Sequence, residues 1–179
     1  MNELDFDKDE LLEMYKLKNI VRYNHRTRLK DENVAEHSFF TTIIALEVCK
    51  RLKVDELTVY LVTIKSLLHD LPETVLNDIT YDVKLKLGLY PVLKQYEDEY
   101  YDENYPEFAA IMKNDEPTLA NLIFKYADAM SVLQYAYNEL ELGNVMFEQI
   151  KDETITRLNI LKSKIQEALL KWKNSNPIL

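Results

Sequence analysis

Apolar side chains recur at intervals of three and four residues along most of this chain, which is the spacing of helices with one buried face. The pattern predicts helices over residues 7–20, 33–52, 55–70, 115–142 and 145–173. Residues 21–32 lack this periodicity and are predicted to form a loop, and residues 79–113 give no clear pattern. The chain is therefore expected to be all-α.

Helix ends are marked by polar residues, prolines and a glycine. Starts are expected at Asn33, at Asp55 and at Asp115 with Pro117. Asn33 followed by Glu36 has the form of a capping box. Pro72 lacks a backbone N–H and should bend or end the helix over 55–70 just past His69 and Asp70. Gly143 should end the fourth helix, because glycine readily adopts the left-handed conformation of a C-terminal cap.

The periodicity also predicts which side chains face the core. In the helix over 33–52 the inward side chains are expected to be Phe39, Phe40, Ile43, Ile44 and Val48. Cys49, the only cysteine, is interpreted as a buried inert thiol. The acidic, tyrosine-rich run at 96–105 is interpreted as a solvated helix face, and the last helix as an amphipathic packing or dimer-forming helix.

Composition limits the class of protein. A length of 179 residues with 47% hydrophobic and 30% charged residues predicts one domain, 1–179, with a metal-binding core at about 10–145 and a C-terminal packing helix at about 145–173. No stretch approaches the roughly 20 apolar residues of a membrane span. The acidic N-terminus is unlike a signal peptide, so a cytoplasmic location without a membrane partner is expected.

Charge and glycine content exclude further classes. The net charge of -9 argues against a nucleic-acid-binding surface. Two glycines are too few for a phosphate-cradling loop or a dinucleotide fold. One segment, 16–30, holds six Lys and Arg residues and no acidic residue. This basic segment either attracts a small anion by its positive charge or is a solvated loop.

Four residues in apolar helical surroundings are candidate metal ligands: His37, His69, Asp70 and Asp128. Each has an ordinary explanation by itself, as a hydrogen-bonded core histidine, a helix cap, or a carboxylate paired with Arg or Lys. Two imidazoles and two carboxylates together suit a divalent transition metal. If they converge on one ion, their burial is explained and a hydrolytic centre follows.

The local sequences around these residues resemble those of a known family. The motifs are DENVAEHS at 31–38, LLHDLPE at 67–73 with Asp78 following, and KYADA at 125–129. Their order, H…HD…D, resembles that of the HD-domain phosphohydrolase superfamily, and the extended matches are most similar to its bacterial 5′-deoxynucleotidase branch. The resemblance covers about residues 10–145 and implies an HD-domain helical bundle.

The resemblance implies a role for each residue of the site. One divalent ion would be held by His37, His69, Asp70 and Asp128. The sequence does not distinguish among Mn, Co, Zn, Fe and Mg as this ion. With a triphosphate substrate, a second ion could also bind. Glu73 would be the acid/base, and four positions after His69 it would share that residue's face on a continuing helix. Arg22 would bind phosphate and, as a catalytic residue, offset charge in the transition state. Lys84 would also approach phosphate, and Asp78 would meet the sugar hydroxyl. Tyr23 stands where the branch usually has a tryptophan against the sugar, which leaves deoxyribose selectivity open.

The function that this resemblance implies is metal-dependent removal of phosphate from (deoxy)nucleoside 5′-monophosphates. The alternative within the superfamily is a dNTP triphosphohydrolase that cleaves dATP to deoxyadenosine and triphosphate, as small phage relatives do. A non-catalytic nucleotide-sensing module and a plain structural bundle are the alternatives outside enzymes. Relatives commonly form dimers or larger rings, so a homo-oligomer is expected.

Overall fold

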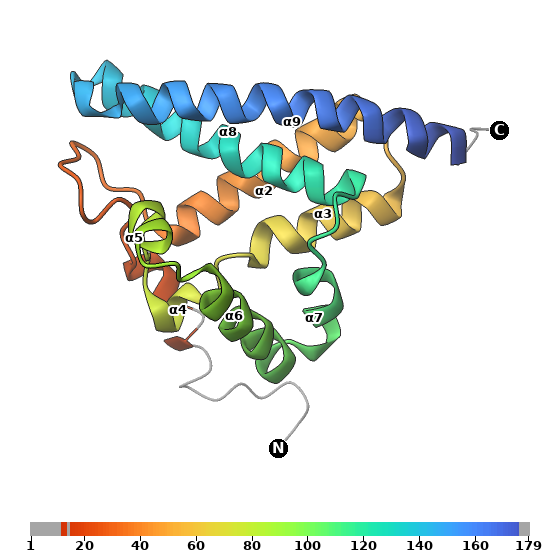
Figure 1. The fold of residues 1–179 in the computed structure, drawn as a ribbon, viewed down its shortest axis with the longest axis horizontal. Coiled ribbons are helices and arrows are strands. Elements are labelled where there is room, and N and C mark those ends of the chain that lie inside the picture. Colours follow the sequence, from red (N-terminus) through yellow and green to blue (C-terminus); the bar gives the residue numbers. More distant parts are fainter. Residues whose placement is uncertain (1–11, 14, 176–179) are drawn as a thin grey trace.

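The computed structural model describes residues 12, 13 and 15–175, and every regular element in that part of the chain is a helix (Figure 1). The elements are η1 (Lys16–Asn19), α2 (Val34–Leu52), α3 (Glu56–Leu68), α4 (Glu73–Leu76), α5 (Tyr81–Lys86), α6 (Tyr90–Asn104), α7 (Pro106–Lys113), α8 (Leu119–Glu141), η2 (Val145–Phe147) and α9 (Glu148–Ser175). The predicted all-α fold is confirmed. A single antiparallel bridge between Val21 and Asn33 closes the loop that precedes α2.

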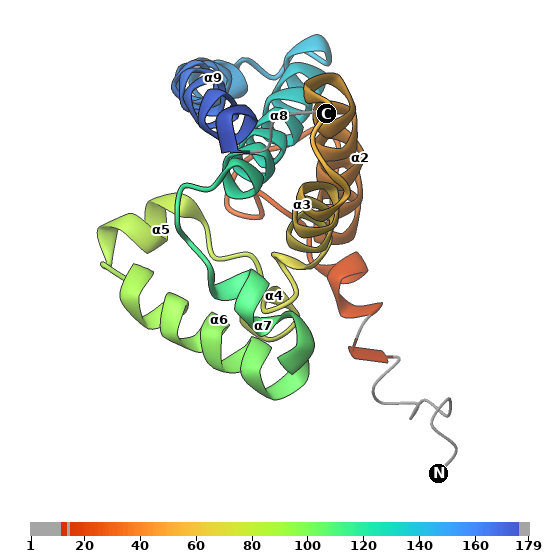
Figure 2. The ribbon, with the colours of Figure 1, turned by 90° about the vertical axis from the view of Figure 1, so that its right-hand side faces the viewer.

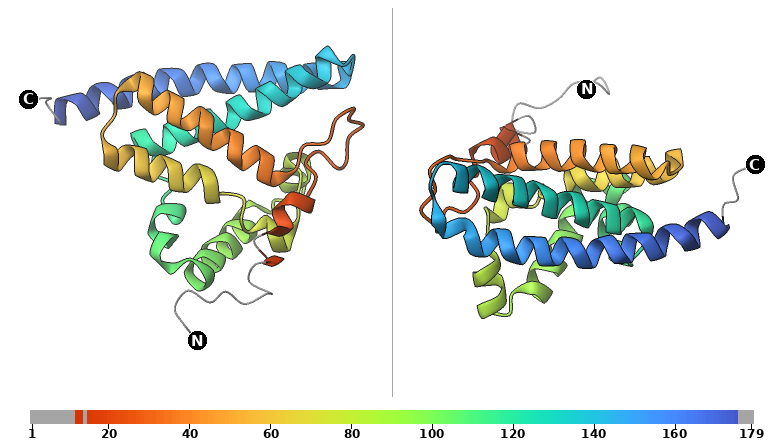
Figure 3. Two further views of the ribbon diagram at one scale, coloured as in Figure 1. Left: turned by 180° about the vertical axis from the view of Figure 1, so that it is seen from behind. Right: turned by 90° about the horizontal axis from the view of Figure 1, so that it is seen from above.

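Four helices, α2, α3, α8 and α9, form the main body of the molecule. Helices α2 and α3 pack against α8, and α9 lies along the other side of α8 (Figures 1 and 2). In the view of Figure 1, α4, α6 and α7 form a smaller group below α3, and α5 lies to the left of α3. The views from behind and from above show the same order of α2, α8 and α9 (Figure 3). The core is made by apolar side chains from all four helices: Ala45, Cys49, Val62, Leu119, Leu122, Ile123, Ala127, Ala129, Leu133, Leu158, Leu161 and Ile165. The division into a core and a C-terminal packing helix stays a prediction.

Most of the predicted helix ends are confirmed. Asn33 and Glu36 form the full capping box at the start of α2, and the Asp55 side chain accepts from Thr58 N at the start of α3. Gly143, just past the end of α8, has a φ of 94°, a conformation that favours glycine. These ends are local signals, which is why the sequence alone identifies them.

The start of α8 lies later than predicted. Its N-cap is Thr118, whose side chain accepts from Asn121 N, and the helix begins at Leu119. The Asn121 side chain donates to the carbonyls of Asn114 and Glu116, at 2.8 and 2.7 Å. These bonds hold the preceding segment as a turn, and Pro117 disfavours a helical Glu116.

The buried face of α2 differs from the predicted one. Phe39, Phe40 and Ile43 are 54%, 54% and 47% exposed, so their predicted inward positions are wrong. Ile44 and Val48 pack against the core as predicted. The buried side chains of α2 are mostly small or polar: Val34, His37, Ser38, Thr41, Thr42, Ala45 and Cys49. Small side chains let α3 and α8 approach closely, and this face turns His37 inward.

Two other segments also depart from the sequence prediction. Of the helix predicted over 7–20, residues 7–11 and 14 lie outside the described part, residues 12, 13 and 15 are helical as predicted, and Lys16–Asn19 is a 3₁₀ helix. The tyrosine-rich run is not a purely solvated face, because Tyr100 and Tyr101 on α6 are buried. The Tyr101 hydroxyl donates to the carbonyl of Leu68, at 2.6 Å, so α6 supports the end of α3.

The Cys49 thiol is buried as predicted, and burial raises its pKa to about 11. Such a thiol stays protonated and unreactive near neutral pH. Among the described helices, none is long and apolar enough to cross a membrane.

The loop that precedes α2 is attached to the far end of α8 by a buried carboxylate. Glu139 is fully buried and accepts hydrogen bonds from the backbone N–H groups of Leu29 and Lys30, the shortest contacts being 2.8 Å. Asn144 donates to the same carboxylate at 2.7 Å. The Tyr135 hydroxyl donates to the carbonyl of Lys30 at 2.6 Å. The loop is therefore fixed to α8 although more than a hundred residues separate them.

Glu139→Gln should destabilise the protein by about 1–3 kcal/mol, because an amide N–H would face backbone donors that then lack an acceptor. Burial alone would raise the pKa of Glu139, but the hydrogen bonds from Asn144 and the loop lower it. The stabilisation should therefore be present at neutral pH and be lost as the pH falls through the depressed pKa. Urea unfolding at pH 7 measures the loss. Glu141→Gln, an exposed change on the same helix, is the matched control, and equal stabilities of the two variants would contradict the role of Glu139.

Candidate metal centre

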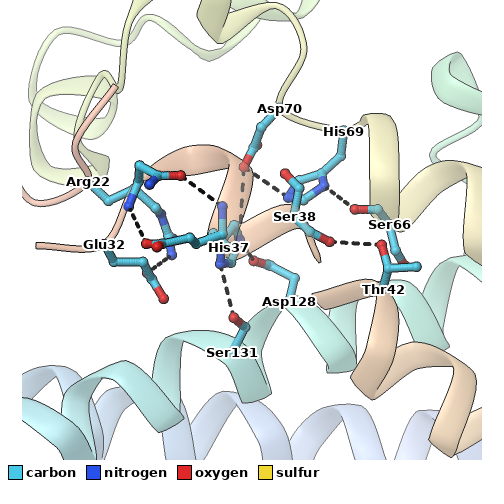
Figure 4. Close-up of polar contacts among 12 residues, drawn as sticks. Arg22, Glu32, His37, Ser38, Thr42, Ser66, His69, Asp70, Asp128 and Ser131 are labelled. Carbon is cyan, nitrogen blue, oxygen red and sulfur yellow. Dashed lines mark hydrogen bonds and ion pairs between the residues drawn. The ribbon is translucent and has the colours of Figure 1, made fainter. Parts of the chain in front are cut away.

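Three elements that are distant in the sequence bring the candidate ligands together. His37 lies in the first turn of α2, His69 and Asp70 follow the end of α3, and Asp128 lies in the middle of α8. Figure 4 shows the four side chains pointing toward one another between these helices. Pro72 ends α3 before the short helix α4, so the His-Asp pair lies in the turn between them.

The distances among these side chains are short. Asp70 Oδ2 lies 3.1 Å from His69 Nε2 and 3.9 Å from His37 Nε2. One ligand atom from each of these three residues lies within 4.8 Å of the other two. Asp128 lies beside this group of three, with its Oδ1 3.2 Å from His37 Nε2. All four predicted ligands are thus found at one place, and the tightest cluster is His37, His69 and Asp70.

The outer nitrogen of each imidazole has a partner away from the cluster. His69 Nδ1 lies 2.9 Å from the carbonyl oxygen of Ser66, which can only accept, so Nδ1 carries the proton. His37 Nδ1 lies 3.2 Å from the Ser131 hydroxyl on α8. When the outer nitrogen donates, the Nε2 lone pair is free and directed into the cluster, which is the arrangement that metal-ligating histidines adopt. The donors present therefore fit a divalent transition metal.

The charges of the cluster follow from burial and from neighbouring groups. Burial, with the nearby Arg22 cation, lowers the pKa of His37 to about 4, so its imidazole is neutral at pH 7. Burial would raise the pKa of Asp70 and of Asp128, but the imidazoles beside them hold both well below the usual range. Burial would also lower the pKa of His69, but the Asp70 carboxylate raises it above its usual value. Two carboxylates and one neutral imidazole thus face the cluster at neutral pH.

The structure adds one partner that the sequence did not single out. Arg157 on α9 donates to Asp128 Oδ2 at 3.0 Å. One oxygen of Asp128 thus faces the cluster, and the other forms the arginine pair that was the alternative explanation for this carboxylate. The role of Asp128 as a ligand stays a prediction. Arg157 is one of many charged residues on a long amphipathic helix, and nothing in its local sequence distinguishes it.

A cleft opens beside the cluster. Its lining includes the polar side chains of His69, Asp70, Glu73, Lys84 and Glu97, together with Pro72, Leu76, Asn77, Ile79 and Leu93. Glu97, on α6, was not a predicted site residue, because it belongs to the run interpreted as solvated.

The placement of Glu73 near His69 is confirmed, but the reason given for it is wrong. The two residues do not share one continuing helix: α3 ends at Leu68, and Glu73 begins the separate helix α4. The turn between them is held by i to i+3 bonds, such as Glu73 N to the carbonyl of Asp70 at 3.0 Å. Burial and the nearby carboxylates of Asp70 and Asp78 raise the pKa of Glu73 to about 9, so it holds a proton at neutral pH.

Arg22 and its neighbours lie on the other side of the cluster. Arg22 Nη1 pairs with Glu32 Oε2 at 2.7 Å, and both side chains are 14% exposed. The Tyr23 ring stacks on Tyr135, with centroids 5.1 Å apart, so it lies in an aromatic cluster that also includes Phe147. Asp78 Oδ2 accepts from Tyr23 N at 3.0 Å. This bond attaches the start of the loop to the segment after α4.

A helical fold that brings the histidines and aspartates of the H…HD…D motif into one cluster defines the class of HD-domain metal-dependent phosphohydrolases. The sequence profile of the family described as 5′-deoxynucleotidase YfbR-like matches residues 11–171. The chain therefore belongs to the YfbR-like 5′-deoxynucleotidase family and is a hydrolase that acts on phosphate monoesters.

Solved structures share the fold at low sequence identity. A conserved hypothetical protein from Pyrococcus furiosus has a TM-score of 0.75 at 20% identity, over 94% of this chain and 99% of its own. An HD-domain phosphohydrolase from Listeria innocua has a TM-score of 0.71 at 20% identity, over 94% and 86%. The HD phosphohydrolase DatZ of cyanophage S-2L, bound to dA and one catalytic Zn²⁺, has a TM-score of 0.70 at 16% identity, over 96% of each chain. Among curated proteins, none matches the sequence.

Zn²⁺ affinity should fall as the pH is lowered through the raised pKa of His69, because a protonated imidazole cannot bind a cation. The neutral His37, with its pKa of about 4, should add nothing to this dependence above pH 5. Competition with a chromophoric chelator between pH 8 and pH 5.5 measures the effect. A His69→Ala variant should bind weakly at every pH and show a flatter profile, and a parent protein with constant affinity over this range would contradict the assignment.

Proposed function

We propose that this phosphohydrolase removes the phosphate group from deoxynucleoside 5′-monophosphates. The observation that carries the proposal is the cleft in which Glu73 and Lys84 lie beside His69 and Asp70. In this cleft, the protonated carboxyl group of Glu73 and the cationic side chain of Lys84 lie next to the candidate metal ligands. These are the groups needed to bind a phosphate monoester and to protonate its leaving oxygen.

His37, His69, Asp70 and Asp128 would hold one divalent ion. When bound, such an ion supplies activated water and polarises a phosphoryl oxygen. Two imidazole donors favour a transition metal over Mg²⁺, which prefers oxygen ligands. The zinc-bound cyanophage structure with the same fold supports this choice.

The other residues near the cluster would bind the substrate or transfer a proton. Arg22 stays charged, because neighbouring acidic groups raise its pKa despite burial, and its guanidinium would grip phosphoryl oxygens. Lys84 would meet the phosphate from the cleft. Glu73 keeps its proton at neutral pH and would donate it to the departing 5′ oxygen of the nucleoside. Tyr23 and Asp78 would border the sugar.

The balance of charge in the cleft favours a monophosphate over a triphosphate. Besides the protonated Glu73, the carboxyl groups of Asp70 and Glu97 line it against one lysine. A triphosphate brings more negative charge than a monophosphate and needs further cations to offset it. Beyond Arg22, which would bind the single phosphoryl group, the basic segment contributes little, since Arg28 already pairs with Asp31 at 2.6 Å.

Purified protein loaded with Mn²⁺, Co²⁺ or Zn²⁺ should release inorganic phosphate from dAMP. A parallel reaction with AMP tests whether the enzyme selects deoxyribose over ribose. A parallel reaction with dATP would yield tripolyphosphate if the protein were instead a triphosphohydrolase. Phosphate from dAMP without tripolyphosphate from dATP supports the proposal. Tripolyphosphate as the main product, or no hydrolysis of any of the three with metal bound, would overturn it.

Glu73→Gln should lower kcat on dAMP by about 10²- to 10⁴-fold, because the amide cannot supply the proton. Metal affinity should stay near that of the parent, since Glu73 is not among the proposed ligands. Glu99→Gln on α6, an exposed glutamate outside the cleft, is the matched control and should leave kcat unchanged. Equal rates for Glu73→Gln and the parent would exclude Glu73 as the proton donor.

A further inference from the structure

The two oxygens of Asp128 face different partners. Oδ1 lies 3.2 Å from His37 Nε2, inside the candidate metal centre. Oδ2 accepts from Arg157 Nη2 at 3.0 Å, on the side of α9. The carboxylate therefore lies between the cluster and a guanidinium that belongs to a different helix, and it presents a single oxygen to the cluster.

This pairing has a chemical consequence for a metal ligand. A carboxylate can turn about its Cβ–Cγ bond and can bind a cation through one oxygen or two. A guanidinium on Oδ2 restricts that rotation and leaves Oδ1 for the cation, in the way that outer partners orient the ligands of metal sites. Arginine suits this task because its donors have a fixed planar geometry and its charge is permanent.

A plain structural role for Arg157 makes a different prediction. The side chain is 52% exposed, and exposed ion pairs contribute little to folding. The contact between α8 and α9 is made by buried apolar side chains, among them Leu158, Leu161 and Ile165. If Arg157 were only a tether between these helices, its removal would leave metal binding unchanged, and its sole effect would be a small fall in Tm.

We propose that Arg157 is a positioning residue of the metal centre, which holds Asp128 so that one oxygen is directed at the cation. The inference rests on the proposed role of Asp128 as a ligand. It assigns to the last helix a part in the site, in addition to its part in the core.

The test measures Zn²⁺ affinity by competition with a chromophoric chelator, together with Tm, for Arg157→Gln and Arg157→Lys. Arg157→Gln should weaken binding about ten-fold, as loss of an outer partner typically does, with Tm within a few degrees of the parent. Loss of a positive charge near a cation would by itself strengthen binding, so weaker affinity is specific to lost positioning. Arg157→Lys, which keeps the charge and a donor, should recover part of the affinity.

Two further variants make the result decisive. Arg51→Gln removes another exposed arginine that pairs with a carboxylate, that of Glu47 on α2, and should change neither quantity. Asp128→Asn tests whether Asp128 is itself a metal ligand.

If Asp128→Asn weakens Zn²⁺ binding and Arg157→Gln does not, the positioning role is overturned and the proposed centre stands. If neither weakens binding, Asp128 is not a ligand, and this part of the proposed function fails with it. A fall in Tm in Arg157→Gln with unchanged affinity would make Arg157 a tether only.

Discussion

The site depends on the hydrogen bonds made by the outer nitrogens of two imidazole rings inside a helical core. An imidazole buried among apolar side chains is costly unless its polar atoms are satisfied. The Ser66 carbonyl and the Ser131 hydroxyl meet this need for His69 and His37. Because those partners lie outside the cluster, both Nε2 atoms are turned inward toward the carboxylates. The candidate metal centre is a consequence of that orientation.

The same constraint explains the unusual face of α2. His37 must reach between α3 and α8, so the residues around it on that face are small or polar, while two phenylalanines point to solvent. A hydrophobicity pattern ranks Phe39 and Phe40 as core residues, because it records how apolar a side chain is and not which helix it meets. The orientation of α2 is set by the polar cluster as much as by apolar burial.

The sequence predicted the features that depend on neighbouring residues. The all-α fold, the capping box at Asn33 and the stop at Gly143 follow from local patterns. The gathering of the four candidate ligands was expected only from the family resemblance of the three motifs. Contacts between distant segments could not be predicted in this way. Glu139 holds a loop that is more than a hundred residues away in the sequence, and Arg157 on α9 pairs with Asp128 on the neighbouring helix α8. Even the closeness of Glu73 to His69 arises from a proline turn and not from the helix that the spacing suggested.

The contacts that hold the cluster are made within the protein itself. Asp70 bridges toward both imidazoles, the outer nitrogens are engaged, and Asp128 has an arginine partner. Around this cluster, α2, α3, α8 and α9 share an apolar core, unlike small zinc modules in which the cation takes the place of such a core. Loss of an ion should therefore cost this protein far less of its fold than it costs a zinc finger.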